Sequence, residues 1–240
     1  MKIIIVVPVF NEEKILKQNI LKIFEFCNNN LSIDWQIIIA DNKSTDQTSN
    51  IGKTLALVYQ EVEYLYVDKQ GKGVAIKTAW EKYSGDIYCF MDADLATGLS
   101  ALPPLINGFT GGYDLVIGSR YHVHSKVNRT FIRKIFSLGY RLVLKIFLGL
   151  KVLDAPCGFK AINSKIKENI LPKVQNDKWF FDSELLILVY KQGYKIKEIP
   201  VTWLDPREGK DKSRVKAISL SWNYFIQILA IKKRLKDNNE

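Results

Sequence analysis

The sequence predicts an α/β protein with a mostly parallel central sheet that helices flank on both faces. Short apolar runs alternate with segments of helical periodicity over the first 120 residues, and this alternation is typical of parallel sheets. Polar clusters directly follow several of the runs, as expected where ligands bind at the carboxyl ends of parallel strands. The chain has 240 residues, 47% of them hydrophobic, which suits a single domain.

Five buried strands are expected in the first half of the chain. Each is a short, mostly apolar run, and they fall within residues 2–10, 35–41, 62–68, 86–92 and 113–120. The segments between them predict helices within residues 16–27, 44–60, 71–85 and 100–109. Asn11 is a candidate cap for the first of these helices, and Ser44 to Asp46 are candidate caps for the second.

The regular alternation stops after Arg120. Residues 129–150 predict a basic amphipathic helix, and residues 153–162 predict a loop. A helix within residues 179–193, a strand within 194–204 and a final helix over 215–236 follow.

The net charge of +10 is concentrated in two segments. Residues 115–153 contain eight Lys or Arg and no Asp or Glu, and residues 207–236 contain nine basic and two acidic residues. Such confined positive charge indicates an anionic partner, whether a phosphate, a lipid headgroup or a nucleic acid. The alternative is an ordinary solvated, lysine-rich surface.

Asp92 and Asp94 follow the fourth expected strand with one residue, Ala93, between them. In an extended backbone, residues two apart point to the same side, so both carboxylates can face one ligand. Hard oxygen ligands suit Mg2+ or Mn2+, which commonly also bind substrate phosphates. The alternative is a loop in which one aspartate caps the helix near Ser100 and the other is solvated.

Two further strand ends carry candidate binding residues. Asp41 precedes the capping residues, and a carboxylate there can accept hydrogen bonds from a base or from ribose hydroxyls. Lys69 and Lys72 lie beside glycines at a helix entry, which suits an anion, although a plain glycine turn explains the same residues. Neither a P-loop nor a Gly-x-Gly-x-x-Gly motif after the first strand is present.

Eight short motifs together carry a resemblance to a known family. They are VPVFNEE, ADNKSTDQT, GKGVAIKTAW, DADLAT, GSR, DAPCGFKAI, WFFDSELL and EIPVTW, spread over about residues 3–215. In this order they resemble family 2 glycosyltransferases, and most of all the dolichyl-phosphate β-glucosyltransferase and polyprenyl-phosphate sugar synthase branch. The resemblance implies a GT-A-like fold and an inverting enzyme that uses a nucleotide sugar and a divalent metal, Mg2+ or Mn2+.

The resemblance also assigns roles to individual residues. It implies that Asp41 meets the base and that Lys72 lies near the base or ribose. Asp92, beside Ala93, would lie near the ribose and donor sugar, and Asp94, with Asp92, would hold the metal. The remaining residues of the implied nucleoside pocket are Pro8, Phe10, Asn11 and Glu12.

Two departures from the family pattern matter. Asn42 stands where the common motif has an acid, which puts base contacts from that position in doubt. The residues after Asp94 are Leu-Ala-Thr rather than the Leu-Gln of mannosyl-phosphate synthases, which favours UDP-glucose over GDP-mannose as donor. Because the alternation of strands and helices stops after Arg120, we interpret residues 1–120 as the nucleotide-sugar-binding half and residues 121–240 as the acceptor-side half of one glycosyltransferase domain.

The implied acceptor is a polyprenyl or dolichyl phosphate. Its oxygen is already anionic at pH 7, so positioning and charge compensation matter more than a strong base. Asp182, near a helix start, is the candidate base or acceptor-positioning group. Asp182 and Glu184 do not share a helix face, so at most one faces the site, and an ordinary helix-start carboxylate is the alternative. The candidate phosphate ligands are Arg120, Arg129, Arg133, Lys210, Lys212 and Arg214.

The sequence favours a cytoplasmic protein that lies peripherally on the cytoplasmic face of a membrane. The uncharged segment 217–231 is shorter than the roughly 20 apolar residues of a spanning helix, so no transmembrane helix is expected. Basic amphipathic helices with aromatic residues can lie on an anionic leaflet, although packing of such a helix against the domain is the alternative. Three widely spaced cysteines fit a reducing compartment.

Four other functions are alternatives at this point. A soluble family 2 glycosyltransferase acting on a sugar hydroxyl or protein would have the same fold, and so would a mannosyl-phosphate synthase. A nucleotidyltransferase also uses paired aspartates but would release pyrophosphate. A basic nucleic-acid-binding module is disfavoured, because the strand ends are acidic and no aromatic RNA-binding signature is present.

Overall fold

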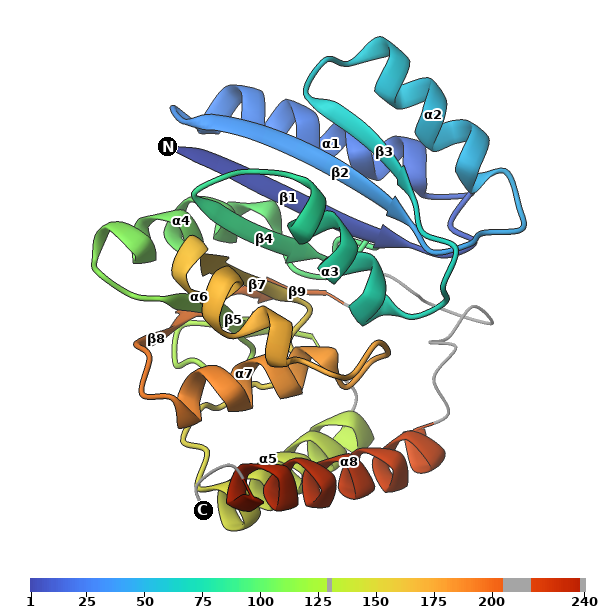
Figure 1. The fold of residues 1–240 in the computed structure, drawn as a ribbon. Coiled ribbons are helices and arrows are strands. Elements are labelled where there is room, and N and C mark those ends of the chain that lie inside the picture. The colour runs from blue at the N-terminus through green and yellow to red at the C-terminus, as the bar shows by residue number, and fades with distance from the viewer. Residues whose placement is uncertain (129–130, 205–216, 238–240) are drawn as a thin grey trace.

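The computed structural model describes residues 1–128, 131–204 and 217–237, with the backbone alone described for 131–136 and 217–222. A seven-stranded sheet with strand order β3-β2-β1-β4-β7-β5-β8 forms its centre (Figure 1). All neighbouring strands are parallel except β7, which is antiparallel to both β4 and β5. The strands are β1 (Lys2–Val9), β2 (Asp34–Asp41), β3 (Val62–Tyr66), β4 (Ile87–Met91), β5 (Leu115–Ser119), β7 (Phe159–Asn163) and β8 (Ile196–Pro200).

Helices cover both faces of this sheet, and a pair of helices forms a further layer (Figure 1). The helices next to the sheet are α1 (Leu16–Asn30), α2 (Thr48–Val58), α3 (Lys72–Lys82), η1 (Leu99–Ala101), α4 (Leu102–Thr110), α6 (Ser164–Asn169), η2 (Leu171–Lys173) and α7 (Phe181–Lys191). The pair, α5 (Phe131–Leu148) and α8 (Ala217–Asp237), lies side by side beyond α7. A small parallel ladder joins β6 (Lys126–Val127) to β9 (Thr202–Trp203).

The α/β fold and the five predicted N-terminal strands are confirmed. Residues 3–7 of β1 and 37–40 of β2 are fully buried, because both strands are interior strands covered on two faces, which explains their unbroken apolar runs. The parallel register places the ends of β1 and β2 side by side, with Val9 opposite Asp41. The carboxyl ends of β1, β2 and β4 therefore meet at one edge of the sheet, as expected.

The prediction of a loop over residues 153–162 is wrong in its second part. Residues 159–163 form β7, which inserts between β4 and β5. The charged Lys160 interrupts the apolar run, and this conceals a strand whose lysine is in fact fully buried. Because β7 and β8, which follow residue 120, pair with β4 and β5, which precede it, the sheet extends across the predicted boundary between the two halves. Assignment of functions to those halves stays a prediction.

Two details of the predicted elements are also corrected. Helix α1 begins at Leu16 with Ile15 in the cap position, so Asn11 is not its cap. Asn11 instead has a left-handed backbone (φ 54°), and its side-chain oxygen accepts the Thr45 N–H at 2.8 Å. The predicted strand 194–204 breaks at Val201 into β8 and β9.

Candidate functional site

Lys72 lies at the centre of a buried charge cluster at the carboxyl edge of the sheet. It is the first residue of α3 and follows Gly71, whose φ of 147° favours glycine. The Lys72 ammonium lies 2.8 Å from Oδ1 of Asp92 and 3.0 Å from Oδ2 of Asp182. The structure therefore brings together three of the predicted site residues, two of which are 110 positions apart in the chain.

The cluster keeps Lys72 protonated. Burial by itself would lower its pKa, but the carboxylates of Asp182 and Asp92 hold the pKa of Lys72 above its ordinary value. The half-exposed ring of Trp179 adds a cation–π contact, with its centroid 5.6 Å from the ammonium. A fixed positive charge thus lies between two carboxylates and beside an aromatic ring.

Asp92 and Asp94 follow β4 as predicted, in different surroundings. Asp92 keeps 42% of its side chain exposed, and its Oδ2 lies so close to Gly158 that a Cβ there would fall 1.9 Å away. Asp94 accepts the Ala96 N–H at 3.1 Å. Between them, Ala93 accepts a hydrogen bond from the Asn19 amide at 2.8 Å, which ties this loop to α1.

Two neighbouring carboxylates are a suitable donor set for a hard cation. Among the residues the structure describes, no three His, Cys, Asp or Glu side chains form a metal-binding group. In proteins, Mg2+ commonly binds through one or two carboxylates together with water and substrate phosphates. That both carboxylates face one ligand stays a prediction.

Asp41 is completely buried at the end of β2. Its carboxylate accepts the Tyr64 hydroxyl at 2.6 Å and the Ser44 N–H at 2.9 Å. Burial, aided by Asp41, raises the pKa of Tyr64 to about 12. Asn42 bonds to the Lys69 carbonyl and the Gly71 N–H, so this strand end fixes the entry to α3. Contact of Asp41 with a base stays a prediction.

The predicted nucleoside-pocket residues lie together at the end of β1. Pro8 is opposite Ala40 in the register, and Phe10 is 36% exposed. The Glu12 N–H donates to the Thr48 hydroxyl at 2.8 Å, which fixes the loop after β1 against α2. These residues border the same edge as Asp41, and their role in binding a nucleoside stays a prediction.

The two carboxylates of α7 have different partners, as their spacing predicts. Asp182 faces Lys72 and is 4% exposed, and its Oδ1 has no hydrogen-bond partner within the described part of the chain. Glu184 accepts the N–H groups of Gln175 and Asn176 and pairs with Arg234 of α8. Glu184 therefore holds a loop and a helix in place, whereas Asp182 belongs to the charge cluster.

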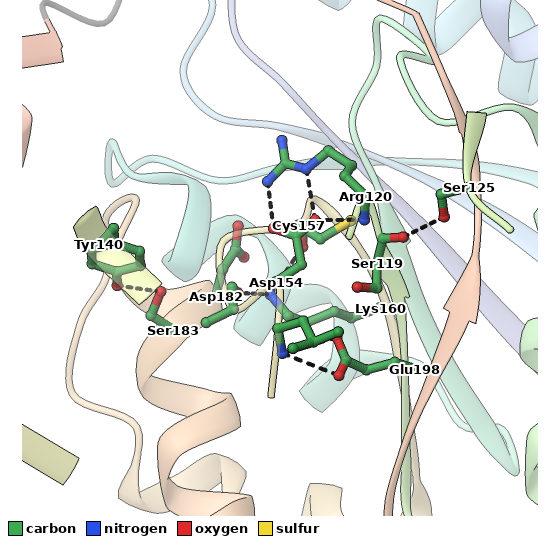
Figure 2. Close-up of polar contacts among 12 residues, drawn as sticks. Ser119, Arg120, Ser125, Tyr140, Asp154, Cys157, Lys160, Asp182, Ser183 and Glu198 are labelled. Atoms are coloured by element: carbon green, nitrogen blue, oxygen red, sulfur yellow. Dashed lines mark hydrogen bonds and ion pairs between the residues drawn. The ribbon is translucent and has the colours of Figure 1, made fainter. Parts of the chain in front are cut away.

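Arg120 lies in a buried ion pair that the sequence does not reveal (Figure 2). Its Nε and Nη2 lie 2.7 and 2.6 Å from the two oxygens of Asp154, which also accepts the Arg120 backbone N–H. Burial alone would lower the pKa of Arg120, but Asp154 holds it above its ordinary value. An acceptor phosphate would have to compete with Asp154, so the predicted clamp stays a prediction.

The other predicted phosphate ligands lie where less is described. Arg133 is in α5, where the backbone alone is described, and Arg129, Lys210, Lys212 and Arg214 lie outside the described residues.

Sequence reasoning missed the buried charges around residues 153–160. Asp154 and Lys160 are buried and Glu198 is partly buried, and Figure 2 labels all three. Glu198 accepts the Leu153 N–H at 3.0 Å, and burial raises its pKa. The available signal was a charged residue inside an apolar stretch, which predicts a paired buried charge as well as it predicts a loop.

The layer of α5 and α8 exposes an apolar and basic surface. Leu138, Leu142 and Ile146 lie four residues apart on α5 and are 51%, 56% and 68% exposed. Ile226 and Leu229 of α8 are also exposed. Exposed Lys145, Lys232 and Lys233 accompany them. We call these eight residues the helix-pair surface. Within the described residues, no helix has the length and apolar character needed to span a bilayer.

A mostly parallel sheet with helices on both faces and charged side chains at its carboxyl edge defines an α/β fold of the doubly wound kind, in which ligands bind at that edge. The chain belongs to the glycosyl transferase family 2, whose family model matches residues 4–171. The resemblance found in the sequence motifs is thereby confirmed.

Two curated relatives illustrate the resemblance. Glycosyltransferase AglD of Haloferax volcanii is 29% identical over 83% of this chain, and the chain spans 32% of AglD. The dolichyl-phosphate beta-glucosyltransferase of Saccharomyces cerevisiae is 27% identical over 92% of this chain and 72% of its own length. The chain is therefore shorter than these relatives.

A solved structure confirms the expected GT-A-like fold. Glucosyl-3-phosphoglycerate synthase of Mycobacterium tuberculosis, solved with Mn2+, UDP and phosphoglyceric acid, has a TM-score of 0.69 with 19% identity. The match covers 96% of this chain and 78% of that one.

Proposed function

We propose that the chain transfers a hexose from a nucleotide sugar, glucose from UDP-glucose, to a polyprenyl or dolichyl phosphate. The similarity to dolichyl-phosphate beta-glucosyltransferases supports this acceptor and sugar. The observation that carries the proposal is the cluster of Asp92, Lys72 and Asp182. In this cluster the Lys72 ammonium pairs both with Asp92, from the predicted nucleotide-sugar-binding half, and with Asp182, from the predicted acceptor-side half.

The reaction would be a single in-line displacement at the anomeric carbon, which inverts its configuration. Lys72 holds Asp92 and Asp182 in place and offsets their charge. Oδ1 of Asp182, which accepts no hydrogen bond from the described residues, suits a contact that orients the acceptor. Because the oxygen of a lipid phosphate is already anionic, orientation rather than proton removal is the main demand on the protein.

Asp94 and Asp92 would hold Mg2+ or Mn2+, as their paired carboxylates fit a hard cation. When bound there, the metal would offset the charge that develops on the leaving diphosphate. The Mn2+ and UDP in the M. tuberculosis synthase support this expectation.

A lipid acceptor also requires access to a membrane surface. The helix-pair surface supports peripheral contact with the cytoplasmic face of an anionic membrane, because it combines exposed apolar side chains with lysines. Its helices are joined to the cluster, since Tyr140 of α5 donates to Ser183 at 2.7 Å and Tyr224 of α8 donates to the Trp179 carbonyl at 3.2 Å.

Transfer of radiolabelled hexose tests the proposal. Purified protein is incubated with labelled UDP-glucose, Mn2+ and polyprenyl phosphate in liposomes, and label that extracts into organic solvent is counted. We expect UDP-glucose to exceed GDP-mannose as donor and EDTA to abolish transfer. Label only in soluble sugars would favour the soluble-acceptor alternative, and no transfer from any donor would overturn the proposal.

Vesicle flotation tests the membrane contact separately. We expect the wild type to float with vesicles containing phosphatidylserine, and Leu142→Glu to float several-fold less because it places a charge on the helix-pair surface. Leu57→Glu is the matched control, since Leu57 is 88% exposed on α2, outside that surface. Equal flotation of the two variants would contradict the assignment.

A further inference from the structure

Lys160 is a fully buried lysine to which neither the sequence motifs nor the proposed reaction assigns a role. It lies in the middle of β7, opposite Phe90 of β4 and Ile117 of β5. Its ammonium donates to the carbonyls of Ala155 at 2.8 Å and Cys157 at 2.9 Å, and lies 5.6 Å from the centre of the Phe90 ring.

Burying an ammonium group at this position carries a desolvation cost in free energy. Burial lowers the pKa of Lys160, and the charge of Asp182 opposes that effect. A methionine of similar length would fill the same space without the desolvation cost, and replacing buried charge by apolar side chains is often neutral or stabilising. Packing alone therefore does not explain why a lysine occupies this position. Its hydrogen bonds to the two carbonyls, which only a donor can make, do explain it.

Those carbonyls belong to a tight turn, residues 154–158, that touches Asp92. Asp154 anchors one end of the turn to Arg120, and Lys160 bonds to its middle. At the other end, Gly158 leaves no room for a Cβ, which would meet Oδ2 of Asp92 at 1.9 Å and its Cγ at 2.5 Å. The position of this turn therefore limits where the Asp92 carboxylate can lie.

We infer that Lys160 is a positioning residue of the site, which holds the 154–158 turn so that Gly158 closes against Asp92 and keeps that carboxylate on Lys72. Lys160 acts through Asp92 and touches no substrate. The inference rests on the proposed function, in which Asp92 contributes to binding the nucleotide sugar and its metal.

Binding of UDP with Mn2+, measured by calorimetric titration, tests the inference without turnover. We expect Lys160→Met to raise the dissociation constant about tenfold, the lower end of what loss of an outer-shell partner costs a metal site. Lys165→Met is the matched control, because Lys165 is an exposed lysine on α6, and it should bind as the wild type does.

A double-mutant cycle separates positioning from a general structural effect. If Lys160 acts through Asp92, Lys160→Met should have almost no further effect on the dissociation constant in an Asp92→Asn background. A tenfold loss that persists in that background, or wild-type binding by Lys160→Met, would overturn the inference.

Gly158→Ala keeps the test valid if Lys160→Met fails to fold. Its added methyl group displaces Asp92 directly, so its binding defect should also disappear in the Asp92→Asn background, and persistence of that defect would overturn the inference. A wild type that binds neither UDP nor GDP with Mn2+ would overturn the proposed function together with the inference. Normal wild-type binding with an unaffected Lys160→Met overturns the inference alone.

Discussion

The two sides of residue 120 are stabilised in different ways. On the N-terminal side, buried apolar strands such as β1 and β2 form the core, and the fully or nearly fully buried charged residues among those described are Asp41 and Lys72. On the C-terminal side, the described residues include four such charges, namely Asp154, Lys160, Asp182 and Glu184. Three of these four contact the candidate site or its surroundings. Asp182 pairs with Lys72, Asp154 pairs with Arg120, and Lys160 bonds to the turn that contains Ala155.

This difference indicates that the two sides of residue 120 contribute differently to the one sheet. Apolar burial supplies most of the stability of such domains, whereas buried ion pairs add little net stability but are costly to break. The N-terminal side thus provides a rigid frame of strand ends, and the C-terminal side fixes charged groups against it. The cluster at Lys72 is where the two sides meet.

Removal of the buried carboxylate of Asp182, on the C-terminal side, should have the largest effect on activity. Asp182→Asn keeps the shape of the side chain but removes the charge that faces Lys72. We expect the rate of hexose transfer to fall about 10²-fold, the cost of misplacing reacting groups. Because Lys72 keeps Asp92 as a partner, we expect a modest change in melting temperature. Steady-state kinetics beside Glu168→Gln, an exposed carboxylate of α6, checks this, and a loss below threefold would contradict it.

Breaking the Arg120–Asp154 pair should have the largest effect on stability. Arg120→Met removes the guanidinium that pairs with Asp154, whose side chain is fully buried, and we expect a loss of about 3–5 kcal/mol. Ile38→Val in the N-terminal core should cost only about 0.5–1.5 kcal/mol. Chemical unfolding measures the free energy of unfolding of both variants. If both variants lost a similar, small amount, the proposed difference between the N-terminal and C-terminal sides would be contradicted.

A smaller loss is expected at the buried charge of the N-terminal side. Tyr64→Phe removes the hydroxyl that donates to Asp41 at 2.6 Å. Because the buried carboxylate keeps the Ser44 N–H, we expect a cost of about 1–3 kcal/mol, the range for one unsatisfied buried group. The same unfolding experiment measures it, and an unchanged midpoint would show that water replaces the lost hydroxyl.

The smallest effect concerns Asp177, which joins the two sides at the surface through Lys69 and Lys77 of the α3 region. Burial alone would raise its pKa, but hydrogen bonds from both lysines bring the pKa of Asp177 below its ordinary value. Its contribution, about 0.2–1 kcal/mol per pair, is therefore complete above about pH 4 and is lost as the pH falls through the lowered pKa. Asp177→Asn should be less stable than the wild type at pH 6 and equally stable near pH 2.

The same contrast explains how much the sequence could predict. The five N-terminal strands were predictable because strands buried on both faces have continuous apolar runs, such as residues 3–7. Strand β7 was not, because Lys160 breaks its run and its partners are carbonyls of a preceding turn. Sequence reasoning selected Lys72, Asp92 and Asp182 individually. Their contact joins residues 110 apart, and no local pattern encodes which charges pair.

The central claim is that Asp92 and Asp182 work as one unit through Lys72. A double-mutant cycle on kcat/KM for hexose transfer, with Asp92→Asn, Asp182→Asn and the double variant, tests it most directly. Residues that act as a unit are strongly non-additive, so the double variant should lose little more activity than the more damaging single variant. A loss equal to the product of the two single losses would show that the carboxylates act independently and would contradict the account.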